Sequence, residues 1–377
     1  MKVSFCFYVC CCVCAIDACA AQGQNSDTQA RTPQYKSGTE SIPGAFADEP
    51  LLEQASIAKA VEYIETGNRL WWKQRNCVAC HTSGVYGTSR PALTPFLGKP
   101  DPSRRQLLVD DLTKTKSARI ETLRTGIRPT QVAYLAGALA EWDRHVTGSL
   151  SPETDDALRL MLSLQSKDGS FHNSGCWPPL ESSAYHGATV AAMAIHTAPG
   201  WRSGLKNEDL AAQVALTNHY LGTTAPPHDY GRLLLLWTAT RVPNLIDAKQ
   251  QKSLINMVLN HQQDDGGWSI RTFATPDTWG NGGRAGKLKA EPEFNNPPSD
   301  GHQTGLAILV LRDAGIPATD KRIQRGIRWL MTNQRKSGRW WTRSLNTDKS
   351  HFITYSGTCY PLLALSKCNV LPQVTQR

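Results

Sequence analysis

The chain has 377 residues, 40% of them hydrophobic and 19% charged, which is enough for a buried core in one large or two ordinary domains. Its formal net charge is +9, but the basic residues are spread along the sequence, without a basic helix, zinc-finger spacing or aromatic RNA-binding motif. We therefore expect no nucleic-acid partner. The excess charge instead favours attraction to anionic membrane surfaces or to acidic partner proteins.

Residues 1–20 have the pattern of a secretory signal peptide. One lysine precedes an apolar run from Val3 to Ile16, and the sequence Ala18-Cys19-Ala20 offers an A-x-A cleavage site. The run is too short to cross a bilayer as a helix. We predict an exported protein of the periplasm or cell envelope, with lipidation of Cys19 as an alternative to plain cleavage. A poorly ordered cytosolic terminus is the remaining interpretation.

Residues 21–50 are rich in Gln, Ser, Thr, Gly and Pro and show no apolar periodicity, so they are predicted to form a disordered linker. The leader contains six of the eleven cysteines, which leaves five in the rest of the chain. An odd number in an oxidising compartment leaves one thiol free, or indicates a special use for a cysteine pair.

Helices are predicted from Leu51 onward, because apolar residues recur at three-to-four spacing in segment after segment. The segments are 53–66, 129–146, 152–165, 187–198, 207–221, 230–242, 248–262, 305–315, 322–334 and 360–368. Capping residues precede several of them, namely Ser151, Asn207, Asp247 and Thr319. No run alternates as a strand would, so the fold is predicted to be all-α.

Three of these helices end in one shared motif, Q-x-x-[DS]-G-x-[WF]. Its copies are Gln165, Asp168, Gly169 and Phe171; Gln262, Asp265, Gly266 and Trp268; and Gln334, Ser337, Gly338 and Trp340. A threonine follows each copy, just before a helix of small and aliphatic residues, at Thr189, Thr304 and Thr358. Recurrent helix–loop–helix units indicate a repeat architecture, in which each unit buries its apolar face on its neighbours.

The repeated motif resembles the QW motif of squalene–hopene cyclases and, more broadly, of the terpenoid cyclase and protein prenyltransferase superfamily. The resemblance covers residues 51–368 and leaves residues 369–377 as a tail. It implies an α/α toroid, in which paired helices form two concentric rings around a central cavity, and an apolar, isoprenoid-like ligand within it. The Gly-, Pro- and Asn-rich insertion from Thr275 to Pro298 is expected to cover one mouth of the ring.

The catalytic motifs of that superfamily are altered in this sequence. Squalene–hopene cyclases protonate an alkene with a D-x-D-D-T motif, and the similar stretch here is DGHQT, with His302 where the family's proton donor stands. Imidazolium is a poor substitute for the strong acid that an alkene requires. The prenyltransferase zinc site is also incomplete, because Gly357 falls where its histidine belongs. An isoprenoid enzyme with Asp300 and His302 as altered catalytic residues is therefore kept as an alternative, as is a zinc site on Asp300, His302 and His351.

Residues 76–84 read NCVACHTSG and contain the pentapeptide C-x-x-C-H. In haem c two thiols bond to the haem vinyl groups and the adjacent histidine supplies the proximal axial bond to iron. We therefore predict haem c, with Cys77 and Cys80 as the thioether residues and His81 as the proximal ligand. Zinc held by the same three residues, or a disulfide or free thiols at the two cysteines, are the alternatives.

The distal iron ligand must come from a distant part of the chain. No methionine lies between the motif and Met161, so the axial methionine of small cytochromes c is absent. His186 and His302 head predicted inner helices at similar positions of the repeat, and either is a candidate distal ligand. Trp71, Trp72 and Tyr86 are candidates to shield the haem from water.

The sequence as a whole predicts an exported, squalene-cyclase-like toroid that carries one covalent haem c. Its expected role is electron transfer with a redox partner protein, or redox chemistry on an apolar molecule held in the ring. The first alternative is the isoprenoid cyclase or transferase with an altered acid motif. The second is a non-enzymatic scaffold of the cell envelope, with structural zinc or a disulfide at the C-x-x-C-H motif.

Overall fold

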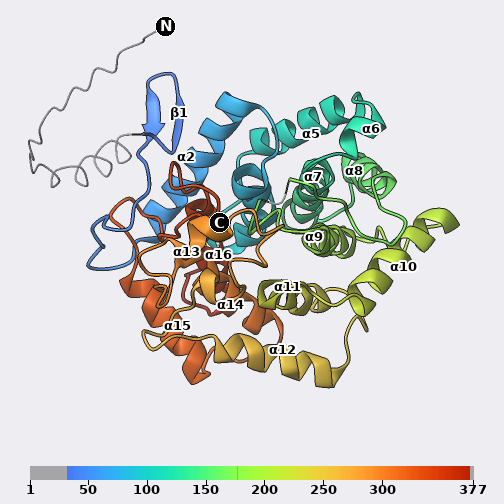
Figure 1. The fold of residues 1–377 in the computed structure, drawn as a ribbon. Helices are drawn as coiled ribbons and strands as arrows, with labels where there is room; N and C mark the ends of the chain where they lie inside the picture. Colours follow the sequence, from blue (N-terminus) through green and yellow to red (C-terminus); the bar gives the residue numbers. More distant parts are fainter. Residues whose placement is uncertain (1–31, 176, 374–377) are drawn as a thin grey trace, which may run out of the picture.

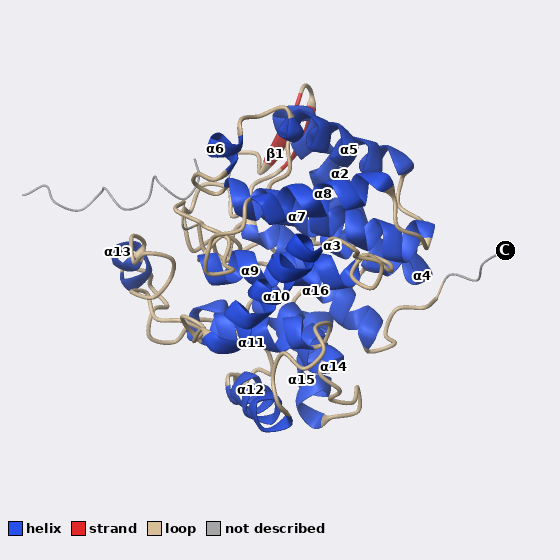
Figure 2. Ribbon diagram, turned by 90° about the vertical axis from the view of Figure 1, so that its right-hand side faces the viewer, coloured by secondary structure: helices blue, strands red, loops and turns tan. Residues whose placement is uncertain are grey.

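The computed structural model describes residues 32–175 and 177–373 (Figure 1). The predicted signal peptide, Cys19 and Cys176 lie outside these residues. Helices make up most of the molecule, as Figure 2 shows, so the prediction of an all-α fold is confirmed. Strands β1 (Tyr35–Ser37) and β2 (Glu40–Ile42) pair in one short antiparallel hairpin. Within the described ranges, no helix is both long enough and apolar enough to span a bilayer.

Within residues 32–175 and 177–373, the helices form six consecutive pairs, each made of an outer helix followed by an inner one. The outer helices are α2 (Ile57–Arg75), α5 (Pro102–Lys116), α8 (Pro152–Ser163), α10 (Glu208–Thr223), α12 (Ala248–Asn260) and α15 (Lys321–Thr332). The inner helices are α3 (Val85–Ser89), α7 (Arg128–Trp142), α9 (Ala184–Thr197), α11 (Asp229–Ala239), α14 (Gly301–Asp313) and α16 (Ile353–Lys367). Shorter helices α4 (Thr94–Leu97), α6 (Ile120–Leu123) and α13 (Ala285–Lys289) lie between the pairs.

Contacts between successive inner helices run from α3 through α7, α9, α11 and α14 to α16, and α16 in turn contacts α3. The inner helices therefore close a ring, and in Figure 1 helices α5, α10, α12 and α15 lie at its periphery. The predicted α/α toroid is confirmed.

The apolar pattern of each helix decides which ring it joins. In α14 every residue from Gly301 to Leu311 is buried, and in α16 every residue from Ile353 to Ser366 is buried. A helix that is apolar on all sides is stable only when it is surrounded by protein. In the outer helix α12, by contrast, only Leu254 and Val258 are buried, which gives a single narrow apolar stripe.

The shared motif proves to be a turn that leads from each outer helix toward the next inner one. Its glycines have nearly identical left-handed backbone angles, with φ of 93° at Gly169, 92° at Gly266 and 89° at Gly338. The tryptophan side chains reach back to the preceding helix, where Trp268 donates to Val258 O and Trp340 donates to Leu330 O. The hydroxyl oxygens of Thr304 and Thr358 accept hydrogen bonds from the backbone amides of the two tryptophans.

The same turns join each unit to the next one around the ring. Gln165 donates to the carbonyl of Gln213 in α10, and Gln262 donates to the carbonyl of Arg322 in α15. Gln334 belongs to the last unit, and its side chain donates to the carbonyl of Ser56, the residue that caps α2. The last repeat therefore bonds to the first, and the ring is closed by the same contact that links its interior units.

The prediction of a disordered linker over residues 21–50 is wrong for residues 32–50, while residues 21–31 lie outside the described ranges. Tyr35 is buried to 1% exposure, and the buried Arg339 pairs with Glu49 and donates to the carbonyls of Pro43 and Gly44. The segment is ordered because its partners lie in the last repeat, more than 280 positions away.

The insertion between Thr275 and Pro298 covers one mouth of the ring, as expected. Its residue Trp279 is 1% exposed and packs against His228 and Tyr230, which begin the inner helix α11. The cap predicted at Thr319 is displaced by one residue, because the Asp320 side chain accepts the first free amides of α15.

Candidate functional site

The C-x-x-C-H motif lies where the outer helix α2 turns into the first inner helix. Asn76 ends α2 in a left-handed conformation, with φ of 48°, and residues Cys80–Gly84 form a π-helical turn that leads into α3. Two hydrogen bonds fix the loop between them: Trp71 Nε1 donates to Cys77 O at 2.9 Å, and Val78 N donates to Asp111 at 2.9 Å. The motif is therefore held on a rigid junction rather than on a free loop.

His81 presents one ring nitrogen to protein and leaves the other available. Its Nδ1 is hydrogen bonded to Thr82 Oγ1 at 2.9 Å, and Thr82 Oγ1 is bonded to the hydroxyl of Tyr35 at 2.8 Å. Nε2 has no hydrogen-bond partner among the residues that the structure describes. Burial lowers the pKa of His81 to about 4, so the imidazole is neutral near pH 7. A neutral imidazole with its second nitrogen fixed is the usual form of a metal-binding histidine.

Two aromatic rings hold the His81 imidazole in place. The Phe352 ring stacks on it, with ring centroids 4.8 Å apart and planes 18° apart, and the Trp71 ring meets it edge-on at 4.8 Å. Phe352 also lies 5.4 Å from the Tyr35 ring. The first helix pair, the N-terminal hairpin and the start of α16 therefore meet at this histidine.

His81 and Cys80 line a cleft of about 630 Å³, which we call the motif cleft. Its walls come from the motif region, from residues 177–181 and from residues 344–353, with Arg284 contributed by the insertion. Contacts join these walls to one another. Glu181 is hydrogen bonded to the Cys80 thiol, which links residues 177–181 to the motif. Asn346 donates to Pro178 O and Phe352 stacks on His81, which link residues 344–353 to the other two walls. The cleft is thus a fixed feature of the fold.

The motif cleft has the size and the lining of a cofactor pocket, and Cys80 and His81 line it, whereas Cys77 does not. The volume of the cleft falls within the range of cofactor pockets, and Trp71, Trp177, Leu180 and Phe352 give it largely apolar walls. Burial raises the pKa of the Cys77 thiol and raises that of Cys80 well above its ordinary value. The two cysteines are unpaired in the structure, so a disulfide between them is not formed.

The structure argues against His186 and His302 as distal ligands. His302 donates from Nδ1 to Ser356 Oγ at 2.7 Å, since the Ser356 hydroxyl itself donates to Ile353 O, and its Nε2 accepts from Tyr230. His186 Nε2 is bonded to Tyr134 at 3.0 Å. Both histidines are buried in the ring and neither lines the motif cleft.

Asp300 and His302 do not form an acid pair that could protonate an alkene. Asp300 caps α14, where its carboxylate accepts the amides of Gln303 and Ile270 at 2.9 and 2.7 Å and the Thr342 hydroxyl at 3.3 Å. Burial raises its pKa to about 6, and burial lowers the pKa of His302 to about 3. The histidine is therefore neutral and cannot deliver a proton at neutral pH.

No preformed zinc site accompanies these residues. Within residues 32–175 and 177–373, no group of three or more His, Cys, Asp or Glu side chains is placed to hold a metal ion. This finding covers both sets of candidate zinc ligands, Asp300 with His302 and His351, and Cys77 with Cys80 and His81.

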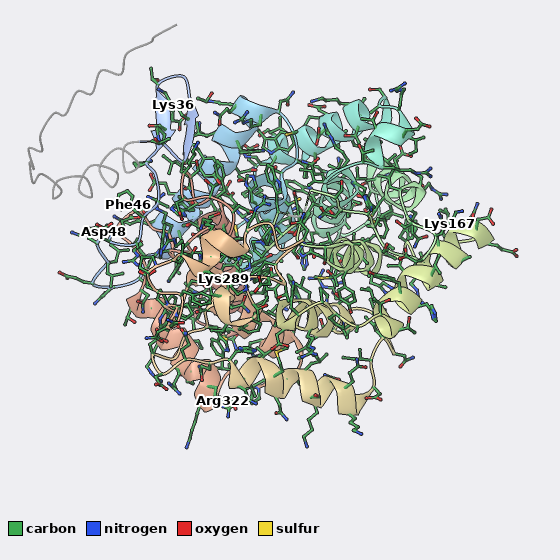
Figure 3. All side chains as sticks on the ribbon, in the orientation of Figure 1. Lys36, Phe46, Asp48, Lys167, Lys289 and Arg322 are labelled. Carbon is green, nitrogen blue, oxygen red and sulfur yellow. The ribbon has the colours of Figure 1, made fainter. Side chains whose placement is uncertain are left out.

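One pocket in the interior of the ring is too small for an isoprenoid. The pocket is lined by Tyr134, His186, Trp237 and Tyr360 and holds only about 40 Å³, close to the volume of a single water molecule. Figure 3 shows that side chains fill much of the space between the helices. The expected apolar ligand therefore has no cavity of its own size at this position.

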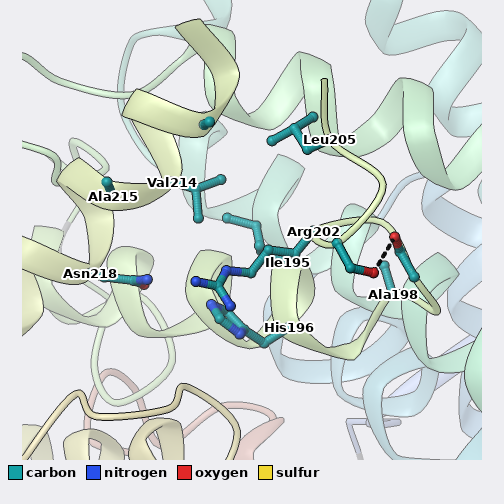
Figure 4. Close-up of a pocket in the computed structure, with 11 residues that line it drawn as sticks. Ile195, His196, Ala198, Arg202, Leu205, Val214, Ala215 and Asn218 are labelled. Atoms are coloured by element: carbon teal, nitrogen blue, oxygen red, sulfur yellow. Dashed lines mark hydrogen bonds between the residues drawn. The ribbon is translucent and has the colours of Figure 1, made fainter. Parts of the chain in front are cut away.

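A second hollow of about 730 Å³ lies between α9 and α10 (Figure 4). Arg202 and His196 project into it beside Val214 and Asn218. None of the residues predicted from the sequence as catalytic, thioether or metal-binding lines this hollow. We use it below as a source of control variants.

Several residues around the C-x-x-C-H motif were not predicted from the sequence. Tyr35, Glu181 and Phe352 contact the motif from segments far along the chain, and nothing in their local sequence marks them. The glutamate alone carries a chemical signal, because burial raises its pKa to about 7. That signal becomes visible only when the fold is known.

Comparison with protein families gives one match, to the squalene-hopene cyclase C-terminal domain, over residues 228–370. A comparison with curated proteins finds no match. The matched segment runs from the start of α11 to the end of α16 and includes two of the three copies of the repeated motif. It does not include residues 76–84. Residues 228–370 of this chain are thus similar to the C-terminal domain of squalene-hopene cyclases.

Proposed function

We propose that this chain is an exported electron-transfer protein that carries one haem c in the motif cleft. Cys77 and Cys80 form the thioether bonds and His81 binds the iron. The observation that carries the proposal is the free Nε2 of His81, which lines a cleft of about 630 Å³ together with Cys80 while its Nδ1 is held by Thr82. A haem c supplies reversible one-electron exchange between Fe(III) and Fe(II).

The surrounding side chains support this function by orienting the histidine and by excluding water. Trp71 and Phe352 hold the imidazole from two directions, and Tyr35 fixes Thr82, to which Nδ1 is bonded. Trp177 is 51% exposed although it lines the cleft, so the apolar wall reaches the molecular surface. Electrons would pass at this rim to a redox partner protein, and no substrate is assigned to the ring interior.

The test is expression of the full chain, leader included, in a host with haem c maturation machinery and in one without it. We expect haem staining that survives a denaturing gel, a reversible change in the visible spectrum on reduction, and recovery of the protein outside the cytoplasm. Cys77→Ala and Cys80→Ala should each weaken covalent attachment, and the double variant should abolish it. Cys368→Ala, which removes a cysteine far from the cleft, should leave it unchanged.

A folded, exported protein that stays colourless in the maturation host would contradict the haem proposal. The envelope scaffold would then be the better function, and metal analysis of the purified protein would decide whether Cys77 and Cys80 bind zinc. The isoprenoid enzyme predicts polyprenyl turnover that is lost in Asp300→Ala and His302→Ala and retained in Cys77→Ala. The capping role of Asp300 and the small ring pocket do not favour it.

A further inference from the structure

His351 is one of the polar residues that line the motif cleft. The side chain is 7% exposed and lies on a residue with a left-handed φ of 46°. Its Nδ1 accepts the backbone amide of Ser344 at 3.1 Å. A backbone amide can only donate, so the neutral ring must carry its proton on Nε2. Burial lowers the pKa of His351 to about 4, which keeps the ring neutral at pH 7.

The Nε2–H group of His351 has no acceptor among the described residues. This tautomer also prevents His351 from binding iron through Nε2, because a metal ligand needs a free lone pair on that nitrogen. His351, which lines both the motif cleft and an adjoining pocket beside Asp348, can therefore offer a ligand a hydrogen-bond donor but cannot bind iron.

Arg284 adds an unpaired positive charge to the same cleft. Arg271 and Arg343 nearby are neutralised by Glu291 and Asp348, whereas Arg75, which also lines the cleft, lies over the Trp71 ring and not against a carboxylate. Arg284 lines the cleft with no carboxylate partner in the described part of the chain. A guanidinium at the edge of an apolar cleft attracts carboxylate groups and binds them in a fixed geometry.

We infer that the motif cleft recognises its ligand by carboxylate groups, which bind to Arg284 and to the Nε2–H of His351. This inference rests on the proposed function and specifies how the haem lies. Haem c carries two propionate carboxylates on the part of its rim that bears no vinyl groups. Thioether bonds would hold the vinyl-bearing part of a haem at Cys77 and Cys80, and Arg284 of the insertion and His351 would bind its propionates.

The experiment compares two free ligands that differ only in these carboxylates. The full chain is purified without bound haem from a host that lacks the maturation machinery. It is then titrated with iron protoporphyrin IX and with the dimethyl ester of the same compound, and binding is followed by the Soret band and by tryptophan fluorescence. We expect the wild-type chain to bind the free acid at least about tenfold more tightly than the ester, as for a charge-assisted hydrogen bond.

Matched variants separate carboxylate recognition from loss of fold. Arg284→Gln and His351→Leu should each weaken binding of the free acid by about tenfold and leave the ester nearly unchanged. Arg284→Lys and His351→Gln keep a charge or a donor and should restore part of the affinity. Arg202→Gln, in the hollow of Figure 4, removes an arginine outside the cleft and should have no effect. Circular dichroism of each variant checks that it is folded.

The inference would be overturned by equal binding of the acid and the ester, or by an equal loss for both ligands in Arg284→Gln. Either result leaves the haem proposal standing if covalent haem forms in the maturation host. Conversely, a preference for the free acid with no covalent attachment in that host would support carboxylate recognition while contradicting the thioether assignment of Cys77 and Cys80.

Discussion

At the scale of single residues, the chain Tyr35–Thr82–His81 shows how a distant side chain can set the state of a site. The hydroxyl of Thr82 lies between the tyrosine hydroxyl and the histidine Nδ1, at 2.8 and 2.9 Å. Partners of this kind fix the tautomer and the ring orientation of metal-binding histidines. The C-x-x-C-H pentapeptide was evident in the sequence, but Tyr35 was not, because it lies among polar residues that resemble a linker.

Replacing Tyr35 by phenylalanine tests this arrangement. The ring contacts to Phe352 and Tyr355 are retained in Tyr35→Phe, and only the hydrogen bond to Thr82 is lost. We expect the free energy of unfolding in urea to fall by about 1 kcal/mol, against about 3–5 kcal/mol for Tyr35→Ala, which also removes the packing. Equal losses in the two variants would show that the hydroxyl, not the ring, accounts for the stabilisation.

At the scale of elements, the repeated motif was predictable because each of its residues has a local and a periodic role. Gln, Gly and the aromatic residue recur at fixed spacing, and the structure gives each copy the same turn. Helix α5 was missed for the opposite reason. Apart from Pro102, its apolar residues are confined to the consecutive run 107–109 and to Leu112, so it lacks the periodic apolar stripe that reveals α12 or α15. Its position is fixed by its neighbours rather than by its own pattern.

Gly338→Ala tests whether the turn requires glycine for conformation or for space. A methyl group there would overlap the carbonyl of Lys59 in α2 and would stand on a residue with φ of 89°. Gly315 is the matched control, since its φ is 96° and a methyl group would meet nothing within 4 Å. Gly315→Ala should cost about 1 kcal/mol, from backbone strain alone. Gly338→Ala should cost at least about 3 kcal/mol, measured by urea unfolding. Similar losses would mean that strain accounts for both.

At the scale of the whole molecule, the buried histidines are expected to dominate the response to acid. Burial lowers the pKa of six histidines to about 3 or 4, namely His81, His186, His196, His228, His302 and His351. An unfolded chain takes up these protons below pH 6.5, whereas the folded chain does not, so the free energy of unfolding falls from pH 6.5 toward pH 4. Glu181 and Asp300 act in the opposite direction, because burial raises their pKa to about 7 and about 6.

Because six histidines outweigh two carboxyl groups, we expect the free energy of unfolding to fall by several kcal/mol between pH 6.5 and pH 4.5. Urea unfolding at intervals of half a pH unit measures this change. His302→Gln keeps a donor for Ser356 and an acceptor for Tyr230 but cannot be protonated, and it should make the pH dependence shallower. The exposed His172, changed to Gln in the same way, should leave the dependence as it is. A stability that stays constant over this range would contradict the burial of neutral imidazoles.

The toroid was predicted from its repeats. The sequence did not predict that the motif cleft lies at the seam of the ring, where the last repeat meets the first. At the seam His81 stacks on Phe352, and the two residues are brought into contact only by closure of the ring. Long-range contacts of this kind leave no periodic trace in either segment.

Because the ring closes through its last repeat, the motif is synthesised before the wall that covers it. The C-x-x-C-H motif is synthesised early, but the wall that faces it, residues 344–353, is among the last parts of the chain to be made. For nearly the whole of that interval the two cysteines have no cleft around them and stand open to any machinery that joins a haem to them. Completion of α16 then encloses whatever has been attached. Under the proposed function, attachment of the haem would therefore come first and its burial second, without any opening of the finished ring.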